Sequence, residues 1–189
     1  MAKGIVFVLS CYAHLFFLAF WGSLITGFFY YGFSGQDQWT CYATQDDQVK
    51  VPWDYNTQGD VPEDYHNVNS NFQVVCIWGF FDYLLALIIW YWMLASKMDS
   101  CEGLKGLSIA VVALSHLAHF LTMMIMRWRH AGKTCSGDYF EPVNRYSLFH
   151  ETYPYLHNAG SFLFYAIISQ FTTVVASISA MGIFAGTDH

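Results

Sequence analysis

Proline is missing from four long apolar stretches of this chain, and charged residues are scarce throughout it. Of its 189 residues, 12% are charged and 55% are hydrophobic. The apolar stretches cover residues 5–33, 72–96, 104–126 and 160–184. Each is longer than the ~20 residues that a helix needs to cross ~30 Å of hydrocarbon. Because a membrane-spanning backbone must satisfy its own amides, and no proline interrupts these stretches, the sequence predicts four transmembrane helices.

The sequence also lacks the motifs of conventional catalysis. It contains no glycine-rich phosphate loop, no nucleophile elbow and no His-Glu-x-x-His zinc motif. The histidines of the two long polar segments are scattered among aromatic residues and do not define a zinc site; they are His66, His130, His150 and His157. We therefore expect a protein that is not an enzyme and does not bind nucleic acid.

The four predicted helices leave too little chain for a second, soluble domain. The expected fold is an all-α membrane protein, with residues 1–189 forming one four-transmembrane-helix bundle. Its two large loops, residues 34–71 and 127–159, fall on one side of the membrane and both termini on the other. Both loops are rich in aromatic residues, which disordered segments lack. We therefore expect the loops to pack together as a cap on one side of the bundle.

Two signals in the sequence disagree about the orientation of this bundle. Lysine and arginine number five in the large loops and three on the terminal side, which favours cytoplasmic loops. The first loop, however, has seven acidic residues and one lysine, and each loop carries one cysteine, Cys41 or Cys135. Such a pair can form a disulfide in an oxidising compartment. We predict this disulfide, cytoplasmic termini, and a location in the plasma membrane or in secretory-pathway vesicles.

One segment carries a resemblance to a known family. It follows the third apolar stretch and reads Arg-Trp-Arg-His-Ala-Gly-Lys-Thr-Cys-Ser-Gly-Asp-Tyr over residues 127–139. It resembles the segment after the third helix of MARVEL-type tetraspan proteins, and the spacing of the spans is similar. The resemblance implies cytoplasmic termini and a non-enzymatic protein that organises membranes or serves vesicle traffic. Several members of that family pair two cysteines within one loop, whereas here the candidate cysteines lie in different loops.

Five polar side chains fall inside the predicted spans, where an ionisable group is costly and marks a functional or paired position. They are His14, Asp82, His116, His119 and Gln170. At 1.5 Å per residue, the depths of Asp82, His119 and Gln170 agree within roughly 5 Å, so a buried cluster is feasible. Such a cluster either fixes the packing of the bundle through hydrogen bonds or provides a proton or ion path.

Haem is one conceivable cofactor, because two histidines from different helices can ligate one iron. The candidate pairs are His14 with His116 and His14 with His119. His14 is, however, displaced from both along the helix axis by roughly 4–9 Å at 1.5 Å per residue.

Calcium is the other conceivable cofactor. The first loop begins like a calcium-binding loop, with candidate ligands Asp54, Asn56, Gln58 and Asp60. The twelfth position is Tyr65, where such a loop needs a bidentate glutamate. We therefore predict no cofactor, with haem and calcium as the alternatives.

Small residues recur along the fourth apolar stretch, at Ser169, Thr173, Ala176, Ser177 and Ala180. This spacing lets helices approach closely, either inside the bundle or between protomers. The leading functional prediction is a MARVEL-like, membrane-organising or self-assembling structural protein. Its partners are membrane lipids and either copies of itself or other membrane proteins. The alternatives are a haem-binding electron-transfer or ion-conducting subunit, and an accessory subunit of a larger membrane complex.

Overall fold

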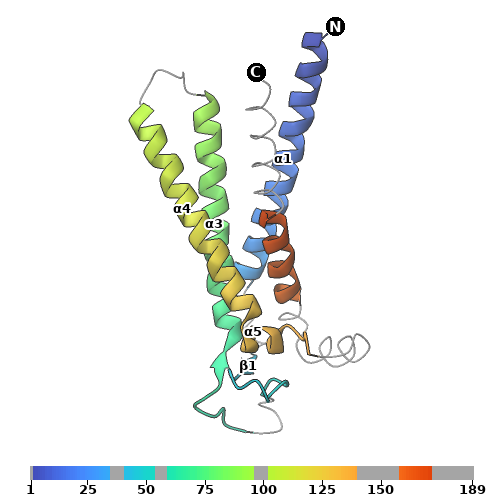
Figure 1. Cartoon of the computed structure of the whole chain (residues 1–189), viewed down its shortest axis with the longest axis vertical. Helices are drawn as coiled ribbons and strands as arrows, with labels where there is room; N and C mark the ends of the chain where they lie inside the picture. The colour runs from blue at the N-terminus through green and yellow to red at the C-terminus, as the bar shows by residue number, and fades with distance from the viewer. Residues whose placement is uncertain (1, 35–40, 54–58, 96–101, 140–157, 172–189) are drawn as a thin grey trace, which may run out of the picture. The chain divides into compact units, whose positions relative to one another are not determined.

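The computed structural model describes residues 2–34, 41–53, 59–95, 102–139 and 158–171 (Figure 1). These residues are mostly helical. The helices are α1 (Ala2–Phe33), α3 (Val68–Ala95), α4 (Glu102–Trp128) and α5 (His130–Cys135). Residues 158–171 are helical as well. The apolar stretches thus form helices as predicted, and the part of the fourth stretch beyond residue 171 lies outside the described residues.

The chain divides into two compact units. The first, here called the helical unit, comprises Met1–Gly35 and Gln73–His119. The second, here called the disulfide unit, comprises Gln36–Phe72 and Phe120–His189. It contains α5 and a small antiparallel sheet of two strands, β1 (Tyr42–Ala43) and β2 (His66–Asn67).

Among the described residues, two helices are long and apolar enough to span a membrane. They are Val68–Trp92 of α3 and Gly106–Trp128 of α4, of which 39% and 11% respectively is buried inside the protein. A core helix of a soluble protein would be mostly buried. Large apolar side chains are instead exposed along both helices, including Phe81, Leu85 and Ile88 on α3 and Leu114, Leu117, Leu121 and Ile125 on α4. Exposed apolar surface of this extent marks contact with a membrane or with another protein.

The start of α3 differs from the predicted start at residue 72, because an asparagine caps the helix earlier. Asn67 Oδ1 accepts a hydrogen bond from the Ser70 backbone N–H at 3.3 Å, and its backbone oxygen accepts one from the Ser70 hydroxyl at 3.0 Å. An asparagine in this role satisfies a free N–H of the first helical turn. The helix therefore begins at Val68.

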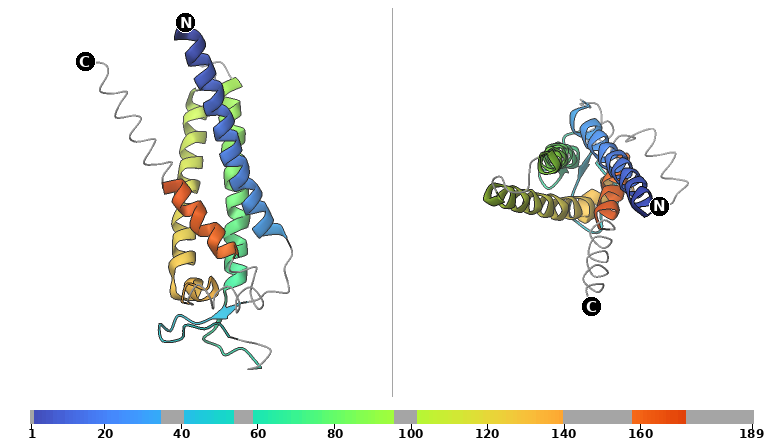
Figure 2. Two further views of the ribbon diagram at one scale, coloured as in Figure 1. Left: turned by 90° about the vertical axis from the view of Figure 1, so that its right-hand side faces the viewer. Right: turned by 90° about the horizontal axis from the view of Figure 1, so that it is seen from above.

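In the helical unit, α1, α3 and α4 lie side by side (Figure 2). The Phe28 ring of α1 lies 5.3 Å from the rings of both Tyr83 on α3 and His119 on α4. Gly79 makes this approach possible. A Cβ atom there would lie 2.7 Å from the Phe28 ring and 2.8 Å from the His119 ring. The side chain of Gln73 also donates a hydrogen bond to the Gly32 oxygen at 3.2 Å, which joins α3 to α1.

Candidate functional site

The structure contains the predicted disulfide between Cys41 and Cys135. The two Cα atoms lie 6.0 Å apart, and 94 positions separate the residues in sequence. Both cysteines are fully buried. Cys41 immediately precedes β1 and Cys135 ends α5, which packs against β1. The Cys41 backbone oxygen also accepts the Val68 N–H at 2.9 Å. The disulfide therefore connects the two polar segments at the point where α3 begins.

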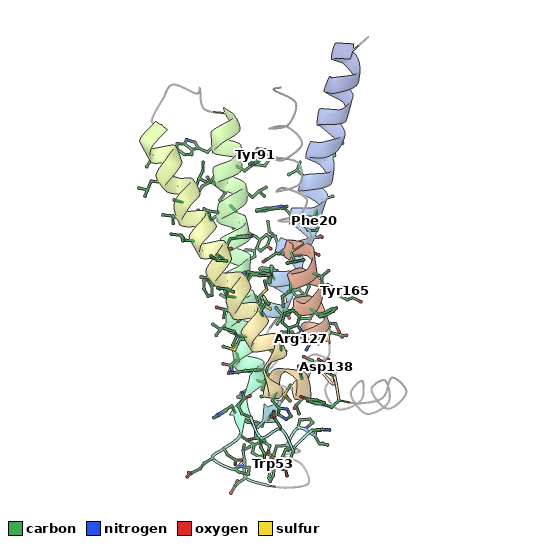
Figure 3. The ribbon with its side chains drawn as sticks, viewed as in Figure 1. Phe20, Trp53, Tyr91, Arg127, Asp138 and Tyr165 are labelled. Atoms are coloured by element: carbon green, nitrogen blue, oxygen red, sulfur yellow. A yellow bond between two sulfur atoms is a disulfide. The ribbon has the colours of Figure 1, made fainter. Side chains whose placement is uncertain are left out.

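A buried arginine at the end of α4 connects three segments of the disulfide unit. Arg127 Nη1 and Nη2 donate to the two carboxylate oxygens of Asp138 at 2.7 and 2.9 Å (Figure 3). Its Nε donates to the Gly160 backbone oxygen at 2.8 Å, in the helix of residues 158–171. A two-pronged, charge-assisted contact of this kind is stronger than a neutral hydrogen bond and fixes its geometry. Arg127 thus holds α4, the turn after α5 and the following helix together.

Glycine allows the chain after α5 to turn back toward Arg127. Gly137 has a φ of 75°, and its N–H donates to the Thr134 oxygen at 3.1 Å. The next N–H, that of Asp138, donates to the Lys133 oxygen at 3.0 Å. This pair of bonds is a Schellman motif, which ends a helix with a residue in the left-handed region. The motif places the Asp138 carboxylate against Arg127.

His130 connects α5 to the first polar segment. Its Nε2 lies 2.7 Å from the Val49 backbone oxygen, and because a carbonyl only accepts, Nε2 carries the hydrogen. Its Nδ1 lies 2.9 Å from the Tyr139 hydroxyl and 3.4 Å from Asp47 Oδ1. Partial desolvation, with the charges of Asp47 and Asp138, raises the pKa of the Tyr139 hydroxyl. Tyr139 therefore stays protonated at neutral pH and can donate to a neutral His130.

Two further glycines of the disulfide unit leave no space for a side chain. A Cβ atom at Gly132 would clash with the backbone oxygen of Met126 and lie 2.9 Å from that of Arg127. A Cβ atom at Gly160 would clash with the side chain of Ser136. Close approach of backbone at Gly132 and of a side chain at Gly160 explains these glycines, because any other residue would push the segments apart.

The helical unit contains a separate polar cluster on α3 and α4. Asp82 Oδ2 lies 2.5 Å from His116 Nδ1, and Asp82 Oδ1 accepts the Ser115 hydroxyl at 2.5 Å. Ser115 in turn accepts the Trp78 indole N–H at 3.4 Å. The Asp82 side chain is 1% exposed and that of His116 is 26% exposed. Asp82 is thus a buried carboxylate with partners on both oxygens.

Aromatic rings enclose the histidines of this cluster. The His116 ring stacks on Trp21 of α1 at 5.8 Å and lies 4.5 Å from the Tyr83 ring. His119 is fully buried, and its Nε2 lies 3.1 Å from the Val75 backbone oxygen. Its other ring nitrogen, Nδ1, has no hydrogen-bond partner among the described residues. His119 Nδ1 is therefore a buried acceptor to which no described residue donates a hydrogen bond.

The structure describes contacts for some of the intramembrane residues that the depth estimate considered. That estimate grouped Asp82 with His119 and Gln170, whereas the carboxylate contacts His116. Gln170 is buried and belongs to the disulfide unit. His14 lies within α1, but its side chain lies outside the described residues. Ser115 and Trp78 were missed, although Ser115 is next to His116 in sequence and Trp78 lies one helical turn before Asp82.

Most residues of the other predicted sites lie outside the described part of the chain. Of the candidate calcium ligands, only Asp60 is described, and it is exposed. Of the small-residue face, only Ser169 is described; Thr173, Ala176, Ser177 and Ala180 are not. Within the described ranges, no group of three or more His, Cys, Asp or Glu side chains is placed to hold a metal ion.

Comparison with family models, with curated proteins and with solved structures finds no match to this chain. Its function must therefore be inferred from its own residues. Residues 127–139 form a densely bonded segment in the disulfide unit, and Asp82, His116 and His119 form the polar cluster of the helical unit.

Proposed function

We propose that this chain is a non-enzymatic, MARVEL-like structural protein that organises a membrane or assembles laterally within it. In this proposal the apolar stretches 5–33, 72–96, 104–126 and 160–184 are four spans. The termini are cytoplasmic, and the two large loops, residues 34–71 and 127–159, lie outside the cytoplasm or in the lumen of the secretory pathway. The observation that carries the proposal is the bonding of residues 127–139, the segment on which the resemblance rests.

The polar side chains of this segment bond to other parts of the disulfide unit. Arg127 holds Asp138 and Gly160, His130 holds Val49, and Cys135 is bonded to Cys41. A catalytic residue must instead be able to contact a substrate and transfer a proton or form a bond with it. Side chains bonded in this way support a structural role for the segment, which is to hold the two polar segments together.

Exposed aromatic residues of the helical unit support lateral contacts. The Phe33 ring of α1 lies 5.4 Å from Phe80 and 6.2 Å from Phe81 on α3, and Phe29 lies 5.4 Å from Phe80. Phe29, Phe33 and Phe81 are all exposed. Aromatic side chains contribute large contact areas and are enriched at protein interfaces. This surface is suited to lipid tails or to the helices of another membrane protein.

Native mass spectrometry of the full chain, extracted gently from its own membrane, tests lateral assembly. We expect a homo-oligomer, each protomer being two hydrogens lighter than the reduced chain because of the disulfide. The double variant Thr173→Leu with Ser177→Leu should reduce the assembly size if the small-residue face of the fourth stretch forms the contact. A monomer without other bound proteins would contradict the proposal, and co-extracted foreign subunits would support the accessory-subunit alternative instead.

A further inference from the structure

The hydrogen bond of His119 fixes which of its nitrogens is available to bind a proton. The Val75 backbone oxygen can only accept, so the Nε2 atom 3.1 Å away must carry hydrogen. A neutral His119 then has an unprotonated Nδ1 with a free lone pair. This atom is fully buried and receives no hydrogen bond from the described residues. A buried acceptor without a donor is costly, and it marks a position that a proton or a donor molecule can fill.

The contact between Asp82 and His116 also has a definite proton requirement. Asp82 Oδ2 and His116 Nδ1 lie at the distance of an ion pair, 2.5 Å, and such a pair is attractive only when the two residues hold one proton between them. The pair is neutral with that proton, whether it resides on the imidazole or on the carboxylate. If the pair loses this proton it carries a net negative charge, and if it gains a second proton it carries a net positive charge. Either charge is strongly disfavoured inside hydrocarbon, and both residues belong to helices long enough to span a membrane.

We propose that Asp82 and His116 form an intramembrane proton-binding site, in which the carboxylate and the imidazole hold one proton between them and the pair remains neutral, while the nearby His119 keeps its hydrogen on Nε2. The proton is taken from water and resides on Asp82 Oδ2 or His116 Nδ1, and a transfer between them breaks one N–H or O–H bond as it forms the other. A metal ion would need several ligands to converge on it, which these residues do not do. A proton needs only one base at a time.

The surroundings of the site favour retention of this proton. From α1 the site is faced by Trp21 and Phe28, from α3 by Trp78 and Tyr83, and from α4 by Ser115. Of these side chains only Tyr83 titrates. The faces of Trp21 and Tyr83 favour a cation on the His116 ring, since aromatic faces attract positive charge. The Ser115 hydroxyl donates to Asp82 Oδ1 and favours the carboxylate.

The test is nuclear magnetic resonance of the full chain in a lipid bilayer, with ring ¹⁵N labels on histidine and infrared detection of protonated carboxyl groups. The variants His116→Gln and His119→Gln assign the resonances. We expect an imidazolium on His116 and an Nε2–H tautomer on His119. The pair should hold one proton in the folded protein at neutral pH. A neutral His116 beside a protonated Asp82 would also support the site.

The change Asp82→Asn separates a bound proton from an ordinary titrating histidine. It removes the carboxylate charge while keeping the shape, so the imidazolium form of His116 should be lost. The matched control is Asp46→Asn, on an exposed carboxylate of the disulfide unit, and it should leave His116 unchanged. The proposal is overturned by a wild-type His116 that is neutral beside an ionised Asp82 at neutral pH. An imidazolium that persists in Asp82→Asn would overturn it too.

Discussion

The two units of this chain differ in what their polar side chains do. In the disulfide unit, Arg127, Asp138 and His130 bond to groups up to 81 positions away in sequence, and a covalent bridge reinforces them. In the helical unit, the packing is largely aromatic and the polar residues gather at one place, around Asp82. Polar segments can be held together by ion pairs and a disulfide. Apolar helices gain stability mainly from close packing, and a charge buried among them must be neutralised.

The largest difference between the units should appear when the disulfide is removed by the double change Cys41→Ser with Cys135→Ser. In the chain-entropy model, closing a loop of this length contributes about 4–5 kcal/mol. Hydrogen exchange in a bilayer should show faster exchange at β1 and α5, while the segments of α3 and α4 around Asp82 keep their protection. Equal loss of protection in both units would show that they are not stabilised separately.

The next largest effect should come from Arg127→Met. The change leaves the Asp138 carboxylate and the Gly160 oxygen without their donor, and breaking a buried pair in this way costs about 3–5 kcal/mol. Because the Asp138 side chain is 29% exposed, the loss of stability should fall at the lower end of this range. Denaturation of single and double variants with Asp138→Asn measures the coupling. Strictly additive losses would mean that the pair makes no direct contribution.

A change at Gly79 should destabilise the helical unit instead. Gly79→Val adds atoms where Phe28 and His119 already lie within 2.8 Å of a Cβ position, and overpacking of this kind costs about 1–3 kcal/mol. The matched control is Gly22→Ala on α1, where a Cβ atom meets nothing within 4 Å. Replacing a helical glycine there should stabilise the protein by up to about 1 kcal/mol. Similar effects of both changes on thermal unfolding would contradict the described packing of α1, α3 and α4.

The smallest predicted effect is on the alkaline stability of the disulfide unit. The pKa of Tyr139 is raised in the folded protein, so above pH ~10 the folded state binds more protons than the unfolded state. The stability that this tyrosine contributes is therefore present below pH ~10 and is lost as the pH rises further. Tyr139→Phe should remove part of the alkaline decline, measured as unfolding against pH from 8 to 11. Tyr65, whose pKa is raised in the same direction, should account for another part. An unchanged decline in Tyr139→Phe would contradict this assignment.

Sequence was sufficient to predict the long helices and the disulfide, because each depends on a local or countable property. Apolar length defines α1, α3 and α4, and one cysteine in each polar segment indicated the Cys41–Cys135 pair. The partner of Asp82 was not predictable in the same way. Helix α3 is apolar on all sides, so its pattern gives the depth of Asp82 but not the direction in which it points. Depth alone could not distinguish His116 from His119, one turn apart on α4.

The features that sequence did not predict in the disulfide unit are short or depend on contacts between distant residues. Helix α5 has six residues and each strand has two, too few for a periodic pattern to be recognised. The Arg127–Asp138 contact depends on the left-handed Gly137, which places the carboxylate after α5. A Ser-Gly-Asp sequence after a short helical run is the one local signal that could have indicated this turn.

Glycosylation mapping tests most directly whether the first large loop, residues 34–71, lies outside the cytoplasm. The chain has no Asn-x-Ser/Thr acceptor, and the change Asp46→Asn with Gln48→Thr creates one in an exposed turn. The introduced asparagine side chain can still accept the backbone N–H of residue 48, which Asp46 Oδ1 accepts at 3.0 Å. The single variant Asp46→Asn is the matched control without an acceptor. Expression in cells with a secretory pathway should yield a glycosylated double variant and an unmodified single variant. A double variant that folds in the membrane without glycan would place this loop in the cytoplasm and contradict the account.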